Sequence, residues 1–414
     1  MEIDMHLDTA VSSIINARIL DVESGTLSEP STIEIADGEI TAVRAGATTI
    51  ASGAFDAGGR VVSPGLIDGH VHVLASTANL SDLGGESPYY LAAQASRLLG
   101  DMLSRGFTAV RDAGGADFGL AAAVNEELIT GPRLFFGGKA LSQTGGHADM
   151  RGPGTHVLDR HMCCPNIGIV CDGADAVRKA ARENLRTGAD HIKIMLSGGV
   201  ASPTDRVDST QFSDEEIRAA VEEADAANRY VLGHAYTARS VNRGLSLGVR
   251  SIEHGNLIDE KSVELFLEHD AFLVPTLVTY ERLKADGAQF GLPESSQKKV
   301  DDVLYAGIDA LALATEHGVN IVYGSDLLGG MHPHQNHEFV IRSQVQTPQQ
   351  VMRSATTTAA RLLGQEGRLG VVAEGAHADL LVLDANPLDD VTVLGDAETA
   401  IHSVFKGGRA VRRP

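Results

Sequence analysis

The chain has 414 residues, of which 43% are hydrophobic and 21% are charged. This composition is ordinary for a globular protein, and the length suits one large domain with a smaller one. The net charge of −21 argues against nonspecific binding to nucleic acid or to an anionic membrane, because both need basic patches. No apolar run is long enough to span a bilayer. We therefore expect neither nucleic acid nor membrane as a partner.

The N-terminal stretch and the cysteines bear on the compartment. The first ten residues, MEIDMHLDTA, carry acidic side chains where a secretory signal has a basic stretch and an apolar core, which predicts a cytoplasmic protein. Cys163, Cys164 and Cys171 are too few and too clustered for a disulfide framework. Two adjacent cysteines with a distant third also do not fit a zinc ribbon. We interpret all three as ordinary loop thiols.

Both ends of the chain have the pattern of short β-strands. Residues 12–62 contain alternating and β-branched stretches, and the Asp37–Gly38 pair is a hairpin signal. Residues 375–413 show the same kind of alternating and β-branched stretches. The two ends are therefore predicted to fold together into one small β-sandwich domain, formed by residues 1–64 and 368–414.

Residues 65–367 alternate strand-like apolar segments with amphipathic stretches that are typical of helices, such as 174–189, 213–229 and 300–318. Eight strands alternating with helices favour an α/β fold of the closed (β/α)8 TIM type over an open doubly wound sheet, which remains the alternative. The eight predicted strands are residues 65–73, 107–114, 132–138, 190–196, 230–235, 250–255, 272–277 and 319–326.

The first predicted strand lies in SPGLIDGHVHV, residues 63–73, which places His70 and His72 two positions apart. Side chains two residues apart on a strand point to the same side, so the two imidazoles converge. Such a pair is either half of a metal site or two polar side chains at the surface that bind nothing together. The pair alone does not decide between these interpretations.

Further polar residues fall at or near the carboxyl ends of the predicted strands, on the face where barrels of this kind build active sites. Lys193 lies in the apolar run HIKIML, an unusual place because an ammonium group is costly to bury without a partner. Asp326 also has the position of a helix N-cap. A lone strand histidine is usually a satisfied polar side chain, but six candidates at one edge predict a metal centre: His70, His72, Lys193, His234, His254 and Asp326.

The chain resembles the amidohydrolase superfamily over nearly its whole length. Five segments carry the resemblance and look like the metal-binding signatures of that superfamily in order: PGLIDGHVH, HIKIMLSGG, VLGHAY, SIEHG and YGSD. The resemblance implies two divalent metal ions. Zn²⁺ is the expected ion for imidazole and carboxylate ligands, with manganese, cobalt or iron as alternatives.

The resemblance also distributes the ligands between the two ions. It implies that His70, His72 and Asp326 bind the first ion. His234 and His254 are then ligands of the second ion, and Lys193 carries a carbamate that bridges both. A free lysine is a poor ligand at neutral pH because it is protonated, whereas a carbamate is an anion with two oxygens.

By the same resemblance, a hydroxide that bridges the two metal ions attacks an amide carbonyl, with Asp326 as the general acid and base. The segments SQTGGHADMRGPG and HAY look like those of the prolidase-like branch of the superfamily. That likeness implies that His147 stabilises the carbonyl oxygen and that Tyr236 contacts the carbonyl or carboxylate end of the substrate. The competing interpretations are a surface-loop histidine and a tyrosine that packs in the barrel.

Two more groups are candidates for substrate binding. Ser197, Gly198 and Gly199 follow the lysine and are predicted to line the pocket. Arg239 is a candidate partner for a terminal carboxylate, although an exposed helix arginine is the competing interpretation.

Three histidines follow Asp326 in the segment HPHQNHEF: His332, His334 and His337. We interpret them as part of a polar loop at the mouth of the site, in preference to a third metal site, and we expect His337 to face the substrate.

The sequence therefore predicts a metal-dependent hydrolase that cleaves amide or peptide bonds of small substrates such as dipeptides or N-acyl amino acids. The alternatives within the superfamily are hydrolases of a cyclic amide such as an imidazolone, of a carbamate, or of an amide-linked toxin of the ochratoxin type. A barrel that has lost its catalytic site is disfavoured, because all six ligand positions hold competent residues. Relatives of this kind commonly assemble, so we expect a homo-oligomer.

Overall fold

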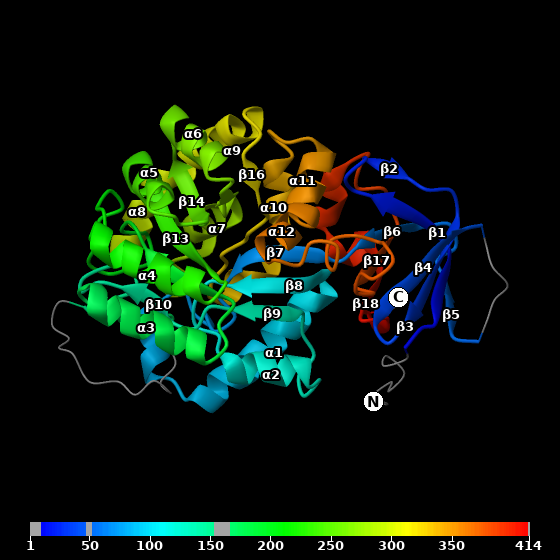
Figure 1. The fold of residues 1–414 in the computed structure, drawn as a ribbon, viewed down its shortest axis with the longest axis horizontal. Helices are drawn as coiled ribbons and strands as arrows, with labels where there is room; N and C mark the ends of the chain where they lie inside the picture. The colour runs from blue at the N-terminus through cyan, green and yellow to red at the C-terminus, as the bar shows by residue number, and fades with distance from the viewer. Residues whose placement is uncertain (1–9, 47–51, 153–165, 413–414) are drawn as a thin grey trace.

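The computed structural model describes residues 10–46, 52–152 and 166–412. Figure 1 shows a large part, in which helices surround a set of strands, and a smaller β-rich part, in which strands from both ends of the chain lie together. The predicted α/β fold is confirmed: the large part is a parallel barrel, and the small part is a sandwich of strands from both termini.

The sandwich has the strand order β19-β18-β17-β6-β1-β3-β4, and β2 and β5 also pair with β1. Strand β1 joins the two layers, because it pairs with β3 and β5 in one layer and with β6 in the other. Apolar side chains from both layers, among them Ile14, Ile33 and Phe405, are fully buried. The strands are β1 (Ser13–Asp21), β2 (Thr26–Leu27), β3 (Ser31–Ala36), β4 (Glu39–Ala45), β5 (Ala54–Asp56), β6 (Val61–Pro64), β17 (Leu380–Leu383), β18 (Ile401–Lys406) and β19 (Arg409–Arg412).

The expected hairpin at Asp37–Gly38 is present between β3 and β4, where Ala36 pairs with Glu39. Both turn residues have positive φ, 51° for Asp37 and 79° for Gly38. A two-residue turn with positive φ at both positions matches the right-handed twist of the strands it joins, and Asp-Gly is a favoured sequence for it.

The barrel strands are parallel and form two ladders, β7-β8-β9 and β12-β13-β14-β15-β16. Backbone hydrogen bonds join the ladders at both seams. Gly69 N–H donates to the Tyr323 carbonyl at 2.7 Å, and Asp190 N–H donates to the Phe136 carbonyl at 2.8 Å. The eight strands are β7 (Leu66–Val71), β8 (Phe107–Asp112), β9 (Arg133–Phe136), β12 (His191–Met195), β13 (Tyr230–Thr237), β14 (Ser251–Leu257), β15 (Phe272–Val274) and β16 (Asn320–Ile321).

Two short strands were absent from the eight-strand prediction: β10 (Ala140–Ser142) and β11 (Gly168–Val170). Strand β10 pairs with β12 through Leu141 and Ile194, and β11 pairs with β10. Three-residue strands have too few positions to show a period of two, so the sequence pattern did not reveal them.

The helices cover the outside of the barrel in Figure 1. The stretches 174–189 and 213–229 contain the helices α3 and α4, and 300–318 is divided between α8 and α9 at Tyr305. The helices are α1 (Pro88–Ser104), α2 (Phe118–Asn125), α3 (Ala174–Arg186), α4 (Asp214–Ala226), α5 (Ala238–Ser246), α6 (Glu260–Glu268), α7 (Leu277–Asp286), α8 (Glu294–Leu304), α9 (Ala306–Glu316), α10 (His337–Arg342), α11 (Pro348–Ser354), α12 (Thr357–Leu362) and α13 (Ala397–Ala400), with 3₁₀ turns η1 (Leu80–Gly85), η2 (Gly329–His334) and η3 (Val391–Gly395).

The helices are positioned by local signals and by an apolar face. In α4, the Ser213 hydroxyl accepts from the Glu216 N–H while the Glu216 carboxylate accepts from the Ser213 N–H, which satisfies two donors at the helix start. On α3, Val177 and Ala181 are four residues apart and both fully buried. Among the residues that the structure describes, no helix is both long and apolar enough to cross a membrane.

The sandwich and the barrel meet where β6 continues into β7. Gly65 lies between these strands, and a Cβ there would be 2.0 Å from the Thr108 hydroxyl, so a side chain has no room. An ion pair of 2.7 Å joins Arg133 of β9 to Asp379, next to β17. The expected domain limits at residues 64 and 368 stay a prediction.

The interpretation of the cysteines as loop thiols concerns Cys171 alone here, because Cys163 and Cys164 lie outside the described residues. Cys171 follows β11, is buried and forms no disulfide. Burial raises the pKa of its thiol to about 12, so it is an inert thiol at neutral pH.

Candidate metal centre and active site

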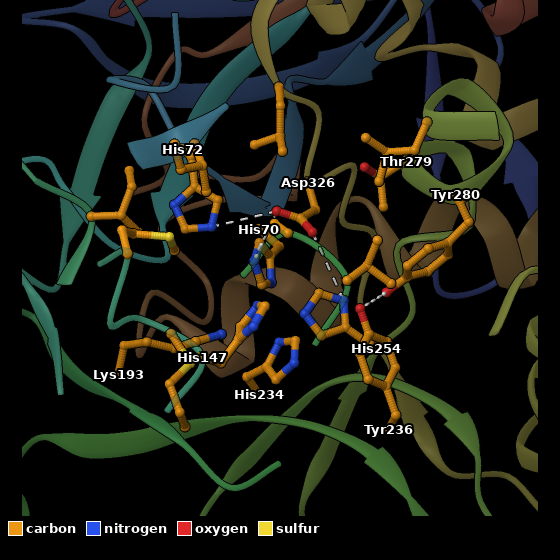
Figure 2. Close-up of a pocket in the computed structure, with 18 residues that line it drawn as sticks. His70, His72, His147, Lys193, His234, Tyr236, His254, Thr279, Tyr280 and Asp326 are labelled. Atoms are coloured by element: carbon orange, nitrogen blue, oxygen red, sulfur yellow. Dashed lines mark hydrogen bonds and ion pairs between the residues drawn. The ribbon is translucent and has the colours of Figure 1, made fainter. Parts of the chain in front are cut away.

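Six predicted ligand residues line one cavity at the carboxyl ends of the barrel strands. The cavity is open to solvent. Figure 2 shows their side chains arranged around a common centre with Asp326 on one side. They are His70, His72, Lys193, His234, His254 and Asp326.

The carboxylate of Asp326 lies among three imidazoles. Its Oδ1 is 3.4 Å from Nε2 of His70 and 3.4 Å from Nε2 of His72, and its Oδ2 is 4.0 Å from Nδ1 of His254. One ligand atom each from His70, His72 and Asp326 lie within 4.8 Å of one another, as a metal site requires. The side chain of Asp326 is 17% exposed, so it faces the cavity.

The backbone holds these residues in unusual conformations. Asp326 has a φ of 50° and His254 a φ of 75°, and positive φ costs about 1–3 kcal/mol in residues other than glycine. The Asp326 N–H donates to the His70 carbonyl at 2.8 Å. Asp68 accepts from the His70 N–H at 3.0 Å and from the Ser325 hydroxyl at 2.6 Å. The first strand and the loop that carries Asp326 are therefore tied together next to the ligands.

Three of the histidines are anchored through ring nitrogen Nδ1. His70 Nδ1 lies 2.6 Å from Glu253, and His72 Nδ1 lies 2.8 Å from the Gly114 carbonyl. His254 Nδ1 lies 2.8 Å from the Thr276 hydroxyl. Because a carboxylate or a carbonyl only accepts, Nδ1 of His70 and His72 carries the hydrogen. Nε2 then keeps its lone pair, as in metal-binding histidines with an anchored second nitrogen.

The electrostatics of this cluster fit a bound cation. Burial lowers the pKa of His72 to about 4, so its imidazole is neutral. Burial raises the pKa of Asp326, but His70 and His72 outweigh this effect and lower it to about 2. For His70, burial lowers the pKa, yet the Asp326 charge leaves it above its ordinary value. Without a cation, the Asp326 carboxylate therefore favours a proton on His70, and a bound divalent ion would take the place of that proton.

Lys193 and His234 are the other predicted ligands that line the cavity. Lys193 is 2% exposed, and no acceptor in the described part of the chain forms a hydrogen bond or ion pair with its amine. Burial lowers the pKa of Lys193 to about 8. The ring of His234 lies 4.5 Å from that of His254, and burial lowers the pKa of both well below the ordinary value. Neutral imidazoles and an amine with a large neutral fraction near pH 8 suit ligation and carbamate formation.

The two predicted catalytic residues besides Asp326 also line the cavity. His147 stacks on His234 with 4.1 Å between ring centres, and its Nδ1 is 2.8 Å from the Ser202 hydroxyl. Tyr236 is 2% exposed and accepts a hydrogen bond from the Tyr280 hydroxyl at 3.2 Å. Neither residue is a surface-loop side chain, and their proposed roles are taken up below.

The loop after β12 lies behind the histidines. The Gly198 carbonyl is 3.2 Å from Nε2 of His234, and the Ser197 hydroxyl accepts from the Tyr236 N–H at 3.2 Å. The cavity wall itself is made by the next two residues, Val200 and Ala201. Gly199 packs directly against His147. Ser197, Gly198 and Gly199 therefore contact the residues that line the cavity.

Other predicted residues lie away from the cavity wall. Arg239 is on the exposed side of α5. His337 is at the start of α10, 3.2 Å from the Glu281 carboxylate. His332 is buried and lies 3.0 Å from the Ala75 carbonyl, and His334 is 42% exposed. None of these four side chains lines the described part of the cavity, so their contact with substrate stays a prediction.

The sequence patterns did not single out several residues of the cavity wall. Tyr280 and Thr279 come from the first turn of α7, directly after β15. A polar pair just beyond the seventh strand was a usable signal, because every barrel strand ends at this face. The apolar part of the wall comes from separate segments of the chain and had no such signal: Leu80, Met150, Ile167, Leu283 and Leu328.

A closed barrel with these side chains at the carboxyl ends of its strands has the active-site arrangement of a (β/α)8 enzyme. A model of the amidohydrolase family matches residues 61–411, and the chain belongs to that family. Ochratoxinase from Aspergillus niger is 32% identical over 367 residues, which cover 86% of this chain and 76% of that protein.

Two solved structures extend the comparison. A prolidase in complex with N-methylphosphonate-L-proline is 47% identical, with a TM-score of 0.94, over 97% of this chain and 99% of that one. A Xaa-Pro dipeptidase with methionine in its active site is 29% identical, with a TM-score of 0.84, over 96% of this chain and 98% of that one.

Proposed function

We propose that this protein hydrolyses amide bonds of small substrates with the help of two divalent metal ions. The observation that carries the proposal is the meeting of four imidazoles, one carboxylate and one buried lysine around a single cavity. Membership in the amidohydrolase family supports hydrolysis. Likeness to a prolidase and to a Xaa-Pro dipeptidase supports an amide bond as the target.

In this proposal, His70, His72 and Asp326 would hold one ion, and His234 and His254 would hold the other. Lys193, as a carbamate, would supply a further anionic oxygen ligand. The anchoring of Nδ1 in His70 and His72 supports the assignment, since it leaves Nε2 of each beside Asp326 and available to a metal. We expect Zn²⁺, which prefers imidazole and carboxylate ligands. When bound, such ions lower the pKa of a water molecule and polarise a carbonyl oxygen.

The side chains of this protein have separate tasks in the proposed reaction. Asp326 takes the proton of the attacking water and passes it to the leaving nitrogen, because its carboxylate is ionised and faces the cavity. His147 and Tyr236 face the cavity from the loop before β11 and from β13, where they hold the carbonyl oxygen as negative charge develops.

The apolar wall bears on the substrate. Met150, Leu283 and Leu328 line the cavity outside the proposed ligands. Such a wall favours an apolar side chain or acyl group next to the scissile amide. Dipeptides and N-acyl amino acids have this form. An amide-linked toxin of the ochratoxin type is a second candidate, favoured by the same wall and by the 32% identity to ochratoxinase.

The test begins with metal analysis of the purified protein and a screen of Xaa-Pro dipeptides, N-acyl amino acids and ochratoxin A. We expect close to two equivalents of metal, together with hydrolysis that a chelator abolishes and Zn²⁺ restores. Absence of stoichiometric metal and of chelator-sensitive hydrolysis would overturn the proposal.

The role of Asp326 is tested by Asp326→Asn. The amide retains an oxygen ligand but does not accept a proton, so we expect kcat to fall at least about 100-fold, within the range for general acid–base catalysis. Metal content is measured on the same sample, and it should stay above half of the wild-type value. An Asn variant that is loaded with metal and fully active would contradict the role.

Two broader expectations are also proposals. We propose that the protein is a homo-oligomer in the cytoplasm. Sedimentation velocity of the purified protein and fractionation of the producing cells test these two statements. A monomer at micromolar concentration would refute the first, and secretion into the medium would refute the second.

A further inference from the structure

Two buried tyrosines meet beside the proposed metal centre. Tyr236 is the last residue but one of β13 and is 2% exposed, and Tyr280 lies in the first turn of α7 and is 1% exposed. Their hydroxyl oxygens are 3.2 Å apart, and Tyr280 is the donor. Both rings face His254, with ring centres 5.3 and 6.2 Å away. Figure 2 shows the pair on one side of the cavity, with the hydrogen bond dashed.

The direction of this hydrogen bond determines whether the Tyr236 hydroxyl presents a donor or an acceptor to the cavity. A tyrosine hydroxyl has a single hydrogen to donate. Tyr280 uses its hydrogen on Tyr236, so Tyr236 is the acceptor in the pair. Among the residues that the structure describes, no acceptor takes the hydrogen of the Tyr236 hydroxyl. That hydrogen is therefore available to an oxygen atom of a molecule in the cavity.

The position of Tyr280 is set by buried contacts on its own segment. The hydroxyl of Thr276, just before α7, is 2.8 Å from Nδ1 of His254. The Val278 N–H donates to the Glu338 carboxylate at 2.7 Å. Arg342 binds Glu338 and donates to the Pro275 carbonyl at 2.8 Å. Since both sides of the first turn of α7 are held, the Tyr280 hydroxyl is placed by the fold and needs no substrate to bring it there.

We infer that Tyr280 is a positioning residue that makes Tyr236 a hydrogen-bond donor to the carbonyl oxygen of the substrate. The inference rests on the proposed amide hydrolysis and extends it. Without the Tyr280 hydroxyl, the acceptor side of Tyr236 is open, and the Tyr236 hydroxyl hydrogen is free to rotate away from the cavity. When Tyr280 donates to Tyr236, the acceptor side of the Tyr236 hydroxyl is occupied. The Tyr236 hydrogen is then directed to the substrate oxygen on which charge develops, where a preorganised donor is most effective.

The competing explanation is that Tyr280 contacts the substrate itself, because it also lines the cavity. A double-mutant cycle separates the two, using the best dipeptide or N-acyl amino acid from the screen. Removal of an oxyanion donor costs about 10²–10³ in kcat, and we expect this for Tyr236→Phe. For Tyr280→Phe we expect a loss of about tenfold in kcat with KM changed by less than about twofold. Both variants keep the ring and its packing.

The kcat of the double variant distinguishes positioning of Tyr236 from direct substrate contact by Tyr280. If Tyr280 acts through Tyr236, the double variant is no slower than Tyr236→Phe alone. Independent effects that multiply would overturn the inference, as would a Tyr280→Phe enzyme with wild-type kcat. A wild-type enzyme without any hydrolysis in the screen would overturn the proposed function and this inference together, so the two failures are distinguishable.

Two further measurements serve as controls for the double-mutant cycle. Calorimetric titration with N-methylphosphonate-L-proline should show weaker binding by Tyr280→Phe in the wild-type background and no further weakening in the Tyr236→Phe background. Tyr305→Phe makes the same chemical change at a side chain that is 74% exposed between α8 and α9. We expect wild-type kcat for this control, and equal metal content and thermal unfolding midpoints for all variants. Loss of metal from Tyr280→Phe would also overturn the inference.

Discussion

Glu253 is the side chain that links the polar core of the barrel to the proposed metal centre. One of its oxygens is 2.6 Å from Nδ1 of His70, and Arg111 donates to both oxygens at 2.8 Å. All three side chains are almost completely buried. Burial raises the pKa of Glu253, but Arg111 and His70 outweigh it and lower the pKa to about 2. The carboxylate is therefore ionised and orients the His70 ring.

We expect Glu253→Gln to weaken metal binding about 10–100-fold, the usual effect of losing a partner behind a metal-binding histidine. The amide fills the same space but gives the His70 ring a weaker, uncharged acceptor. Competition with a chromophoric chelator measures the affinity directly. Glu223→Gln is the control, because Glu223 also pairs with arginines, Arg178 and Arg182, but lies between α3 and α4 and away from the cavity. Unchanged affinity in Glu253→Gln would refute the role.

At the scale of elements, the loop after β12 is held as a compact unit. Its Gly198 N–H donates to the Ser209 carbonyl at 2.9 Å, and the Gln211 N–H donates to the Leu196 carbonyl at 2.9 Å. Lys299, from α8, donates to the carbonyls of Gly199 and Ser202 at 3.1 and 2.9 Å. This loop forms the surface against which the His147 ring rests.

Gly199 is required at its position because a Cβ there would lie 2.1 Å from the His147 ring. We expect Gly199→Ala to displace that ring and to lower kcat/KM about 100-fold, since a misplacement of about 1 Å in a catalytic group can have that effect. Metal content should stay at the wild-type level. Gly85→Ala is the control, because a Cβ at Gly85 meets no atom within 4 Å. A fully active Gly199→Ala enzyme would exclude a positioned His147 from the reaction.

Element prediction from the sequence succeeded where a pattern was long enough to show its period. The amphipathic stretches 174–189 and 213–229 contain the helices α3 and α4, and the apolar runs became barrel strands. The strands β10 and β11 have three residues each and carry no period. Their pairing depends on where β12 lies, which is a contact made across the fold and not along the chain.

At the scale of the whole molecule, ring closure brings the first and last barrel strands together. Asp68, on β7, accepts from the Ser325 hydroxyl at 2.6 Å and from the Gln335 side chain at 2.8 Å. His332, in η2, lies 3.0 Å from the carbonyl of Ala75, which follows β7. The segment after β16 is thus fastened to the segment after β7 by buried polar contacts. Stability and the shape of the site depend on the same closure.

This closure makes stability depend on pH. Burial lowers the pKa of His332 to about 4, below the value of about 6.5 in an unfolded chain. Below pH 6.5 the unfolded state binds more protons than the folded state, so stability is fully present above pH 6.5 and is lost as the pH falls toward 4. For this one group we expect a loss of about 1.4 kcal/mol per pH unit in that window.

Denaturant unfolding of metal-free protein between pH 7 and pH 5 tests this expectation. His332→Gln removes the titrating group and keeps a donor for Ala75, so its stability should fall less steeply with decreasing pH. His269→Gln changes an exposed histidine at the end of α6 and should leave the slope unchanged. Equal slopes for wild type and His332→Gln would show that His332 does not contribute.

The sequence by itself determined the strand and helix periodicity, the split β-rich ends and the placement of six candidate ligands on or soon after barrel strands: His70, His72, Lys193, His234, His254 and Asp326. These features follow from local patterns: alternation along a strand decides which side chains share a side, and parallel strands bring their carboxyl ends to one face. This is why remote residues were predicted to meet, and all six line one cavity.

Only the tertiary structure decided which atoms are free to act. The anchoring of His70 by Glu253, the hydrogen bond from Tyr280 to Tyr236 and the position of Arg239 away from the cavity each depend on the packing of distant segments. A ring nitrogen or a hydroxyl hydrogen is assigned by its nearest partner in space. That partner comes from another strand or helix, so no pattern along the chain specifies it.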